Sequence, residues 1–339
     1  MNLRVSFLNK MELSFESIKK NFHNINEIKK FIVAYSGGID SSVLLDIMIN
    51  SPDEISKKVL AVHINHGISK DSTSWENHCR DFCNENNISF KSIKVDCTKL
   101  NGSSLEEHAR DKRYDRLFEE VSKNEVLLTA HHQDDQAETL FYQLIRGAGS
   151  RGLSCMPKIK ILKKGSHIRP LLDIQKSEIL EYASSRDIKY INDYTNNDNN
   201  YSRNFLRNDI FPLLKERWPN ISETFSRSSK NISKSLSLND DIALLDIGDS
   251  IKDNNESLEI SNIKLLPQYR IENLLRYWIT INSLKPPSQA QLDAIIKDII
   301  FSNKDKTPSF SNSSFQINRR SNTLYIKDKN YKGRIDEGN

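Results

Sequence analysis

One segment constrains the fold of this chain more than any other. An apolar run, 31–35 (FIVAY), leads directly into the turn 36–42 (SGGIDSS) and then into a helical pattern. Two glycines let the backbone turn tightly and approach a ligand closely. The helix that follows offers free N–H groups and the positive end of its dipole. Ser36 and Ser41 add hydroxyl donors, and Asp40 can cap the helix or hold a cation. The segment predicts a pyrophosphate cradle, although an ordinary strand–turn–helix with a serine cap has the same local pattern.

Strand-like and helix-like segments alternate after this turn. Further apolar, β-branched runs occur at 59–64, 90–95 and 126–130. The stretches between them have helical spacing, namely 42–49, 72–86, 104–122 and 136–146. Such alternation predicts a parallel sheet that is covered by helices on both faces. Ligands of these sheets bind beyond the carboxyl ends of the strands, which is where the glycine turn lies.

A second domain is expected after a polar, turn-rich stretch at 192–200 (NDYTNNDNN). We place the boundary at Pro212. The predicted fold class is α/β, with a parallel-sheet, Rossmann-like domain over 1–212 and a smaller, mostly helical domain over 213–339. Partial alternation within 308–327 predicts a small hairpin near the end of the chain.

Composition excludes several classes of protein. The chain has no run of about 18 apolar residues, and its first residues lack the apolar core of a signal peptide. We therefore expect a cytoplasmic protein with no membrane partner. The four cysteines include no CxxC pair, which indicates reduced thiols rather than a disulfide framework or a metal cluster. The net charge of +4 is small, so a nucleic-acid surface must be a local patch.

A second group of chemically active residues follows the fourth apolar run, where 131–139 reads HHQDDQAET. It too lies at a strand end and should face the same crevice as the glycine turn. Alone, the pattern could be a dinuclear metal site, but His131 and His132 should point to opposite sides of an extended backbone. A helix cap and a site for Mg²⁺ bound to a substrate phosphate fit Asp134 and Asp135 better, because magnesium usually takes one or two carboxylates plus substrate phosphates.

These motifs, in this order, resemble those of the tRNA(Ile)-lysidine synthetases. The turn resembles the SGGxDS loop of the PP-loop ATP pyrophosphatase superfamily, whose domain is adenine nucleotide alpha hydrolase-like. The other segments that carry the resemblance are HHQDDQAET with the following RGAGSRGL and MP, and also 61–67 (AVHINHG), 107–114 (EHARDKRY), 169–172 (RPLL), 193–196 (DYTN) and 201–207 (YSRNFLR). Cys155 and Thr195 stand where glycine and serine are expected. The length is similar to that of the shorter members.

The resemblance implies a ligase that uses ATP. The family converts the first cytidine of the CAU anticodon of tRNA(Ile) into lysidine, which changes decoding from AUG to AUA. ATP adenylates the oxygen at position 2 of the cytosine. The ε-amine of free L-lysine then attacks that carbon, and AMP leaves. The implied cofactors are ATP and Mg²⁺, the implied partners are the tRNA and lysine, and a homodimer is expected on the same basis.

Motif positions imply roles for individual residues. The ATP phosphates are expected to contact Ser36, Gly37, Gly38, Ile39, Asp40 and Ser41. We expect Asp40 and Asp135 to hold Mg²⁺, and Asp134 or His132 to position the lysine ammonium or accept its proton. Contacts with tRNA phosphates or with the lysine carboxylate are expected from Arg110, Arg113, Arg203 and Arg207. Arg113 is also a candidate catalytic residue. For each arginine, a structural ion pair is the alternative.

Basic residues in the second domain form a further candidate for tRNA binding. They lie on one helical stretch, or in the expected hairpin, and comprise Lys215, Arg217, Arg227, Lys230 and Lys234, with Arg319 and Arg320 near the end. A solvated helix face is the alternative. If they contact tRNA phosphates, the affinity should fall with salt.

Three other functions remain open at this point. A PP-loop tRNA sulfur transferase would need a catalytic cysteine or a cluster, yet Cys155 lies in a glycine-rich turn rather than in a recognisable nucleophile site. A PP-loop amidotransferase would usually bring a module that supplies ammonia. A catalytically inactive RNA-binding protein on the same fold would lack ATP cleavage.

Overall fold

The structure is a computed structural model that describes residues 12–65, 67, 71–95, 105–192, 198–302 and 307–329. For residues 105–109 it describes the backbone but not the side chains. The DYTN segment, with Thr195, lies outside the described residues. By its internal contacts the chain divides into two compact units, Met1–Ser233 and Lys234–Asn339. This division falls within a long helix, after the expected boundary at Pro212, which stays a prediction.

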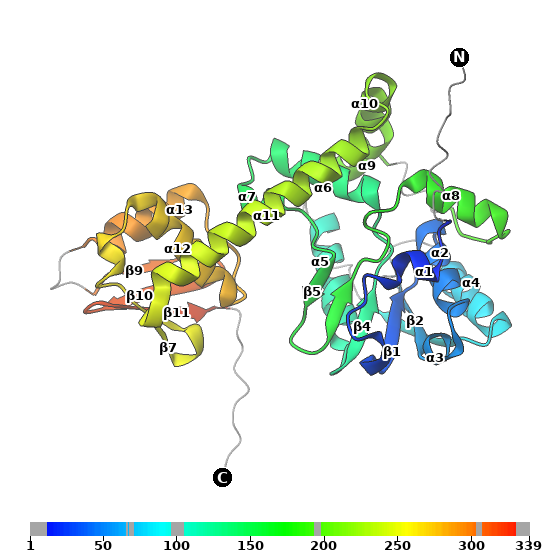
Figure 1. The fold of residues 1–339 in the computed structure, drawn as a ribbon, viewed down its shortest axis with the longest axis horizontal. Helices are drawn as coiled ribbons and strands as arrows, with labels where there is room; N and C mark the ends of the chain where they lie inside the picture. Colours follow the sequence, from blue (N-terminus) through cyan, green and yellow to red (C-terminus); the bar gives the residue numbers. More distant parts are fainter. Residues whose placement is uncertain are drawn as a thin grey trace, which may run out of the picture. The chain divides into compact units, whose positions relative to one another are not determined.

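The first unit is built on a six-stranded sheet of order β3-β2-β1-β4-β6-β5, in which β5 alone among these strands runs antiparallel to its neighbour. The bounds are β1 (Lys30–Ala34), β2 (Val59–Asn65), β3 (Ser89–Lys94), β4 (Glu125–Leu128), β5 (Ile159–Ile161) and β6 (Ser166–Ile168). The expected parallel-sheet domain and its first four strands are confirmed, whereas β5 and β6 were not predicted. Figure 1 shows these strands side by side.

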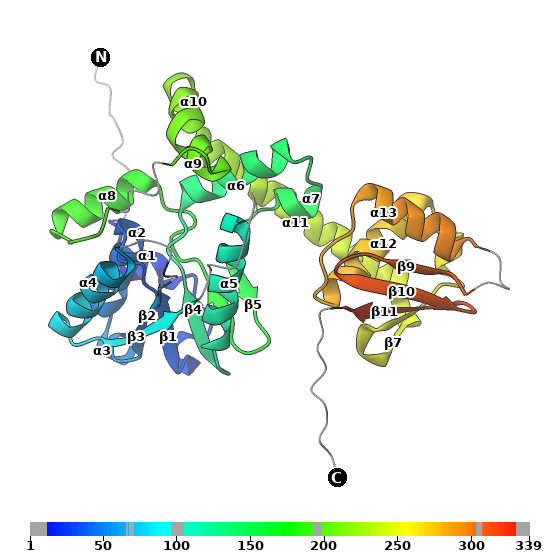
Figure 2. The ribbon, with the colours of Figure 1, turned by 180° about the vertical axis from the view of Figure 1, so that it is seen from behind.

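Helices cover both faces of this sheet, as Figures 1 and 2 show from opposite sides. Successive residues of β1 point to opposite faces, so Phe31 and Val33 join one core and Ile32 joins the other. The first core includes residues of α1 (Phe15–Lys19), α2 (Ile39–Ile49), α4 (Ser72–Glu85) and α8 (Lys176–Ser185). The second core includes Leu117 of α5 (Leu105–Glu119).

The remaining helical elements of the first unit are mostly short. They are η1 (Ile25–Glu27), α3 (Asp53–Ser56), α6 (Gln133–Ile145), α7 (Ser150–Leu153), α9 (Ser202–Phe205), the π-helical η3 (Leu206–Ile210), α10 (Phe211–Arg217) and α11 (Ile221–Ile247), which continues into the second unit. A small aromatic cluster joins α6, η3, α10 and α11 around the ring of Phe211.

The strand order places the candidate site. β1 lies between β2 and β4, so the chain leaves β1 in one direction and returns on its other side at β4. In open α/β sheets the crevice at such a reversal, outside the carboxyl ends of the strands, is where ligands bind. The glycine turn follows β1 and the HHQDD segment follows β4, so both expected motifs lie at this crevice.

The second unit packs helices on a five-stranded antiparallel sheet of order β7-β8-β11-β10-β9. The strands are β7 (Ile251–Lys252), β8 (Ser257–Glu259), β9 (Ser309–Ser311), β10 (Phe315–Arg320) and β11 (Thr323–Asp328). The helical elements are η4 (Gly248–Ser250), η5 (Asp253–Asn255), η6 (Ile263–Leu265), α12 (Gln268–Ile281), α13 (Gln289–Ala294) and η7 (Ile295–Ile300). The expected hairpin is confirmed as β10 and β11, and the apolar core surrounds Trp278.

Arg319 is part of this core rather than a surface cation. Its side chain is buried, and its Nη1 donates to the carbonyl oxygens of Ile299, Ile300 and Ser302 at 2.9, 3.1 and 3.0 Å. These carbonyls lie at the C-terminal end of η7, where backbone acceptors lack helical partners. The expectation that Arg319 contacts tRNA is therefore wrong. Arg320 is exposed, and its contact with tRNA stays a prediction.

No helix among the described residues is both long enough and apolar enough to span a bilayer.

Candidate active site

The glycine turn holds its shape through its own hydroxyl groups. Gly37 has φ +84°, a conformation that favours glycine, and a Cβ there would lie 2.7 Å from Ile191 Cδ1 and 2.9 Å from Cys79 Sγ. Ser41 Oγ lies 3.0 Å from Ser36 Oγ and donates to the Gly38 carbonyl at 2.9 Å. Gly38 is the N-cap of α2, so the first N–H groups of this helix point out of the turn without helical acceptors. The turn is therefore a rigid, positively polarised cradle.

Asp40 lies in the first turn of α2 and faces two cationic groups. Its carboxylate forms an ion pair with Lys176, the first residue of α8, and lies 3.7 Å from His132 Nε2. Burial acts to raise the pKa of Asp40, but His132 and Lys176 outweigh it and hold the pKa at about 2. The carboxylate is ionised at neutral pH. Lys176 was not among the predicted site residues, because 136 residues separate it from Asp40.

His132 connects Asp40 to the start of α6. It is the N-cap of this helix; its backbone N–H donates to Asp135 Oδ2 at 2.9 Å, and its ring Nε2 lies 3.4 Å from the same oxygen. Burial acts to lower the pKa of His132, but Asp135 and Asp40 raise it above its usual value. Burial would raise the pKa of Asp135, but His132 and other cations lower it. One imidazole nitrogen, Nε2 of His132, thus faces two carboxylates, and its Nδ1 is buried without a hydrogen-bond partner among the described residues.

Arg207 of η3 binds two carboxylates of α6. Its Nη2 lies 2.8 Å from Asp135 Oδ1, and its Nε and Nη2 donate to the two oxygens of Glu138 at 2.9 and 2.7 Å. Burial raises the pKa of Glu138 despite this partner. The sequence predicted that Arg207 contacts tRNA or lysine, with a structural ion pair as the alternative. In the structure Arg207 forms an ion pair with Asp135 and Glu138. Glu138 was missed, although it lies one helical turn after Asp134 and therefore on the same face.

Asp134 is paired in the same way by Lys215 of α10, at 2.6 Å. Lys215 had been expected on a solvated or tRNA-binding face. Of the other basic residues in that stretch, Lys230 pairs with Asp173 at 2.6 Å, and Arg227 is exposed on α11. The stretch is not one helix, because α10 ends at Arg217 and α11 begins at Ile221.

His131 points into a different environment from its neighbour. Its Nδ1 lies 2.8 Å from Thr129 Oγ1, and its Nε2 lies 3.0 Å from the Tyr114 hydroxyl. The same Thr129 hydroxyl lies 2.8 Å from Nε2 of the fully buried His167. Burial lowers the pKa of His131 well below its usual value and that of His167 to about 3, so both rings are neutral. The pKa values of the two adjacent histidines are therefore shifted in opposite directions.

The remaining predicted arginines do not join the carboxylate group. Arg110 lies on α5 with Nη2 3.5 Å from His131 Nε2. Arg113 is exposed on the same helix. Arg203 lies on α9, with its guanidinium carbon 5.9 Å from the centre of the Tyr142 ring. The structure thus brings Asp40, His132, Asp134, Asp135 and Arg207 together, whereas these three arginines lie elsewhere, on α5 and α9.

Two family models match the chain. A PP-loop domain model covers residues 10–214, and a TilS substrate binding domain model covers 258–325. Among similar proteins, the tRNA(Ile)-lysidine synthase of Coxiella burnetii is 37% identical over 313 residues, which is 92% of this chain and 69% of that protein. That of Wigglesworthia glossinidia brevipalpis is 39% identical over 320 residues, with 91% and 79% covered.

The chain belongs to the tRNA(Ile)-lysidine synthase family.

A solved structure of an enzyme with another function is also similar to part of this chain. The U34-tRNA thiolase NcsA from Methanococcus maripaludis, with its [4Fe-4S] cluster, superposes with a TM-score of 0.50 and 22% identity, covering 64% of this chain and 77% of that one. At this identity the likeness shows a shared fold. It confirms the expected Rossmann-like architecture.

The described cysteine thiols of this chain lack the lowered pKa that a nucleophilic thiol of a sulfur transferase needs. Cys79 and Cys83 are buried in the core beside α2, and burial raises the pKa of each to about 12. Burial raises the pKa of Cys155 to about 12 as well. Within the described ranges, no three His, Cys, Asp or Glu side chains are arranged to hold a metal ion. A thiolate nucleophile needs a lowered pKa, so the described thiols offer none.

Proposed function

We propose that this chain forms lysidine at the first cytidine of the CAU anticodon of tRNA(Ile), using ATP and free L-lysine. In this proposal residues 1–212 catalyse the reaction and residues 213–339 bind tRNA. One observation supports it above all: the phosphate cradle after β1 and the carboxylates of α6 after β4 meet through the Asp40–His132–Asp135 contacts. Family membership supplies the substrate, and the site supplies the groups that the two chemical steps need.

The first step uses the cradle and its cations. The N–H groups at the start of α2 and the hydroxyls of Ser36 and Ser41 bind the β- and γ-phosphates of ATP. Lys176, now paired with Asp40, lies where it can move its ammonium to these phosphates. The cytosine O2 attacks the α-phosphorus, an O–P bond forms, and pyrophosphate leaves with the broken bond's electron pair. The backbone and Lys176 stabilise the negative charge on that leaving group.

Mg²⁺ fits the ionised carboxylates of Asp40 and Asp135. Both have a lowered pKa and lie near the same nitrogen, Nε2 of His132, so both present oxygen ligands of the kind that magnesium prefers. When bound, the ion would neutralise phosphate charge. His132, whose Nε2 faces both carboxylates, keeps them in fixed orientation.

The second step uses the acidic face of α6. Asp134 binds the ε-ammonium of lysine in place of Lys215 and takes one proton, because only a neutral amine can attack. The amine nitrogen then forms a bond to C2 of the adenylated cytosine. The C2–O bond breaks, and AMP leaves with the oxygen. Glu138, whose pKa is raised, lies one turn away and can hold a second proton of the amine.

In the proposal Arg110, Arg113 and Arg203 bind the tRNA backbone, whereas Arg207 orients Asp135 and Glu138. A homodimer is part of the proposal and is tested by light scattering. The chain is expected to act on tRNA as this assembly.

The deciding experiment is the incorporation of labelled lysine into unmodified tRNA. Purified protein, ATP, Mg²⁺ and labelled lysine are mixed with a CAU-anticodon tRNA(Ile), and a methionine tRNA with the same anticodon serves as the control. We expect ATP-dependent label in the isoleucine tRNA alone. Absence of label while ATP is still cleaved to AMP in the presence of tRNA would reject lysine as the nucleophile and favour sulfide or ammonia.

A further inference from the structure

An exposed tryptophan marks a cavity that the proposed chemistry does not use. Trp218 follows α10 directly and is 56% exposed. It borders a cavity of about 590 Å³, within the size range of small-molecule sites. The described lining includes Phe141 of α6, Leu214 and Arg217 of α10, and Phe225 of α11. All of these residues lie in the first unit.

The walls of the cavity are aromatic and ordered by one another. The Phe141 and Phe225 rings are stacked at a centroid distance of 6.1 Å, and both meet the Phe211 ring edge to face. Beside them the indole of Trp218 leaves much of its surface to solvent. An exposed indole next to a fixed aromatic wall suits a flat, apolar ring, which can stack on it.

The position of the cavity links it to the reacting carboxylates. Asp134, Glu138 and Phe141 are spaced i, i+4 and i+7 on α6, so they share one helix face. Phe141 lies about 10 Å along the helix from Asp134, at 1.5 Å per residue. The ion pair of Lys215 with Asp134 also ties α10 to the start of α6. A flexible strand with one nucleotide at Asp134 can therefore reach the cavity with a nearby nucleotide.

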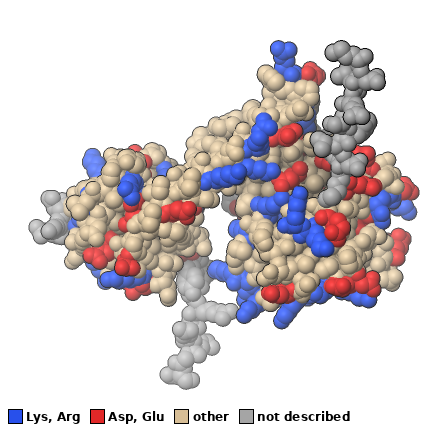
Figure 3. Space-filling model, in the orientation of Figure 1, with Lys and Arg blue, Asp and Glu red and all other residues tan. Residues whose placement is uncertain are grey.

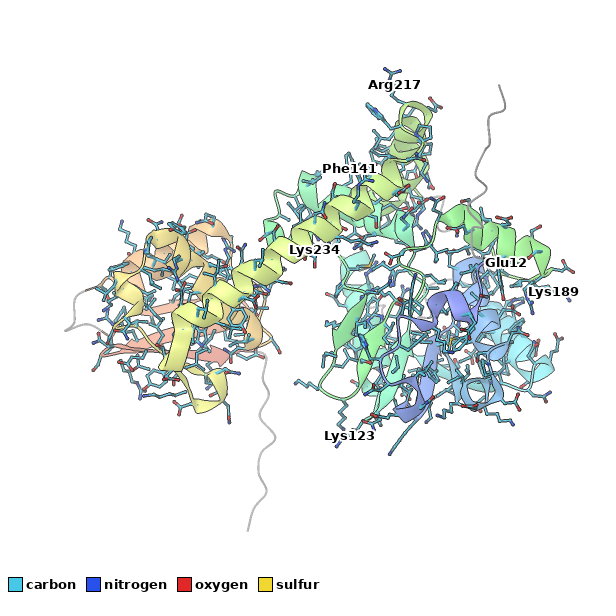
Figure 4. The ribbon with its side chains drawn as sticks, viewed as in Figure 1. Glu12, Lys123, Phe141, Lys189, Arg217 and Lys234 are labelled. Carbon is cyan, nitrogen blue, oxygen red and sulfur yellow. The ribbon has the colours of Figure 1, made fainter. Side chains whose placement is uncertain are left out.

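The charge of the cavity rim selects among flat ligands. Arg217 is the cation of the described lining, which contains no carboxylate. Figure 4 shows Arg217 at the free end of α10, with its side chain directed away from the fold. A guanidinium beside an aromatic wall suits a base attached to a phosphate, since the ring stacks and the phosphate pairs.

We propose that the cavity beside Trp218 binds one unpaired nucleobase of the tRNA, a near neighbour of the reacting cytidine, by stacking on the indole. Arg217 binds the phosphate of that nucleotide. The inference rests on the proposed function, because it takes tRNA as the substrate. It adds a binding site that acts before either chemical step.

The first test compares three variants of the full chain in binding to unmodified CAU-anticodon tRNA(Ile). Trp218→Ala should raise the dissociation constant about tenfold, within the range for loss of one base–aromatic stack. Trp218→Phe, which keeps a stacking ring, should stay within about twofold of the parent. Leu213→Ala is the matched control, since Leu213 is 63% exposed on the same helix but does not line the cavity. The KM for ATP and the melting temperature should not change in any of them.

The second test identifies the base. Anticodon stem-loops that lack a single base, one loop position at a time, are bound to the parent and to Trp218→Ala. At one position the missing base should weaken binding to the parent as much as the substitution does, and the two changes together should add no further loss. Arg217→Ala should reduce the slope of log affinity against log salt by about 0.7, the value for one single-strand phosphate.

Three outcomes would overturn the inference. Equal affinities of Trp218→Ala and Leu213→Ala for the tRNA would show that no nucleobase stacks on the Trp218 indole. If the losses of binding from a missing base and from Trp218→Ala add at every loop position, the cavity does not bind a loop nucleobase. A change in the particle mass of Trp218→Ala by light scattering would make the cavity an interface between copies of the chain. If the parent itself neither binds tRNA nor incorporates lysine, the proposed function fails as well, and this distinguishes the two failures.

Discussion

Arg207 in the first unit pairs with side-chain carboxylates, whereas Arg319 in the second unit pairs with backbone carbonyl oxygens. Arg207 meets the carboxylates of Asp135 and Glu138, and its own side chain stays 44% exposed. Arg319 is 1% exposed and meets four oxygen atoms of carbonyl and hydroxyl groups around the end of η7. The kind of partner indicates whether each arginine can take part in substrate binding or only stabilises the fold. A side-chain partner can be exchanged for a substrate, but a backbone carbonyl cannot be exchanged without unfolding.

Lysine and arginine side chains at the surface also differ in how they are paired. In Figure 3, lysine and arginine side chains lie along the middle of α11. Among the cations of this helix, Arg227 is exposed and Lys230 pairs with Asp173, so they differ in how open they are to a polyanion. The predictions below test the contrast, from the largest expected effect to the smallest.

Asp40→Asn should lower lysine-dependent AMP release about a thousandfold, the upper range for loss of one charge-stabilising group in an active site. Asparagine keeps the shape but removes the charge that meets His132 and Lys176. The measurement is AMP release with saturating tRNA, lysine and ATP. Asp46→Asn on the same helix is the control, because Asp46 pairs with Arg186 rather than with the cradle. Unchanged activity in the Asp40 variant would remove this residue from the mechanism.

Arg319→Ala should lower the free energy of unfolding of the second unit by about 3 kcal/mol, because several carbonyl oxygens lose a charged donor. ATP binding by the first unit should be unaffected. Amide hydrogen exchange over β10 and β11 measures the first effect, and calorimetric titration with ATP measures the second. Arg320→Ala, at the exposed neighbouring position, should leave exchange unchanged. Equal protection in the two variants would contradict a structural role for Arg319.

Acid should destabilise the first unit through His167, one of its buried histidines with a lowered pKa. Its pKa is about 3 in the fold and about 6.5 in an unfolded chain, so the unfolded state binds the proton first. Its contribution is complete above pH 6.5 and falls by about 1.4 kcal/mol per pH unit below that, until about pH 3. His132 has a raised pKa and acts in the opposite direction: its contribution is present below pH 6.5 and is lost as the pH rises through its folded value.

Denaturant unfolding of the parent and of His167→Gln, between pH 7 and pH 4.5, measures this effect. The variant should lose stability more slowly as the pH falls. Parallel curves for the two proteins would show that His167 does not control the response to acid.

The smallest effect concerns salt. Arg227→Ala should reduce the slope of log tRNA affinity against log salt by about 0.9 if it neutralises a duplex phosphate. Lys230→Ala is the matched comparison on the same exposed helix, since Lys230 already pairs with Asp173 and should change the slope less. Filter binding at several salt concentrations provides both slopes. An equal change in the two variants would remove the contrast between paired and exposed cations on this helix.

The parts that sequence could predict are those set by local signals. The run FIVAY, the paired glycines and the serine-rich helix start lie within twelve residues, so β1, the turn and α2 follow from the sequence itself. The HHQDD segment is equally local, and its placement beside the turn follows from the rule for parallel sheets. The opposite orientation of His131 and His132 also agrees with the alternation expected of extended backbone.

The parts that it could not predict depend on distant residues. Lys176 reaches Asp40 across 136 positions, and Lys215 reaches Asp134 across 81. The residues next to Lys176 and Lys215 in the sequence do not indicate which carboxylate each lysine pairs with. Arg319 is different, because Phe315, Ile317 and Arg319 alternate along β10 and therefore share the buried face. Reading this alternation through to its third member would have placed Arg319 in the core.

The paired carboxylates of α6 have a consequence for how lysine enters. Each acid there already holds an internal counter-ion, Lys215 on Asp134 and Arg207 on Asp135 and Glu138. In the proposed reaction, a lysine that binds Asp134 therefore displaces the ammonium of Lys215, which stays attached to α10 close by. Its affinity depends on how tightly the resident ammonium is held rather than on how acidic the site is. The enzyme can thus keep a strongly anionic helix face without concentrating every passing cation on it.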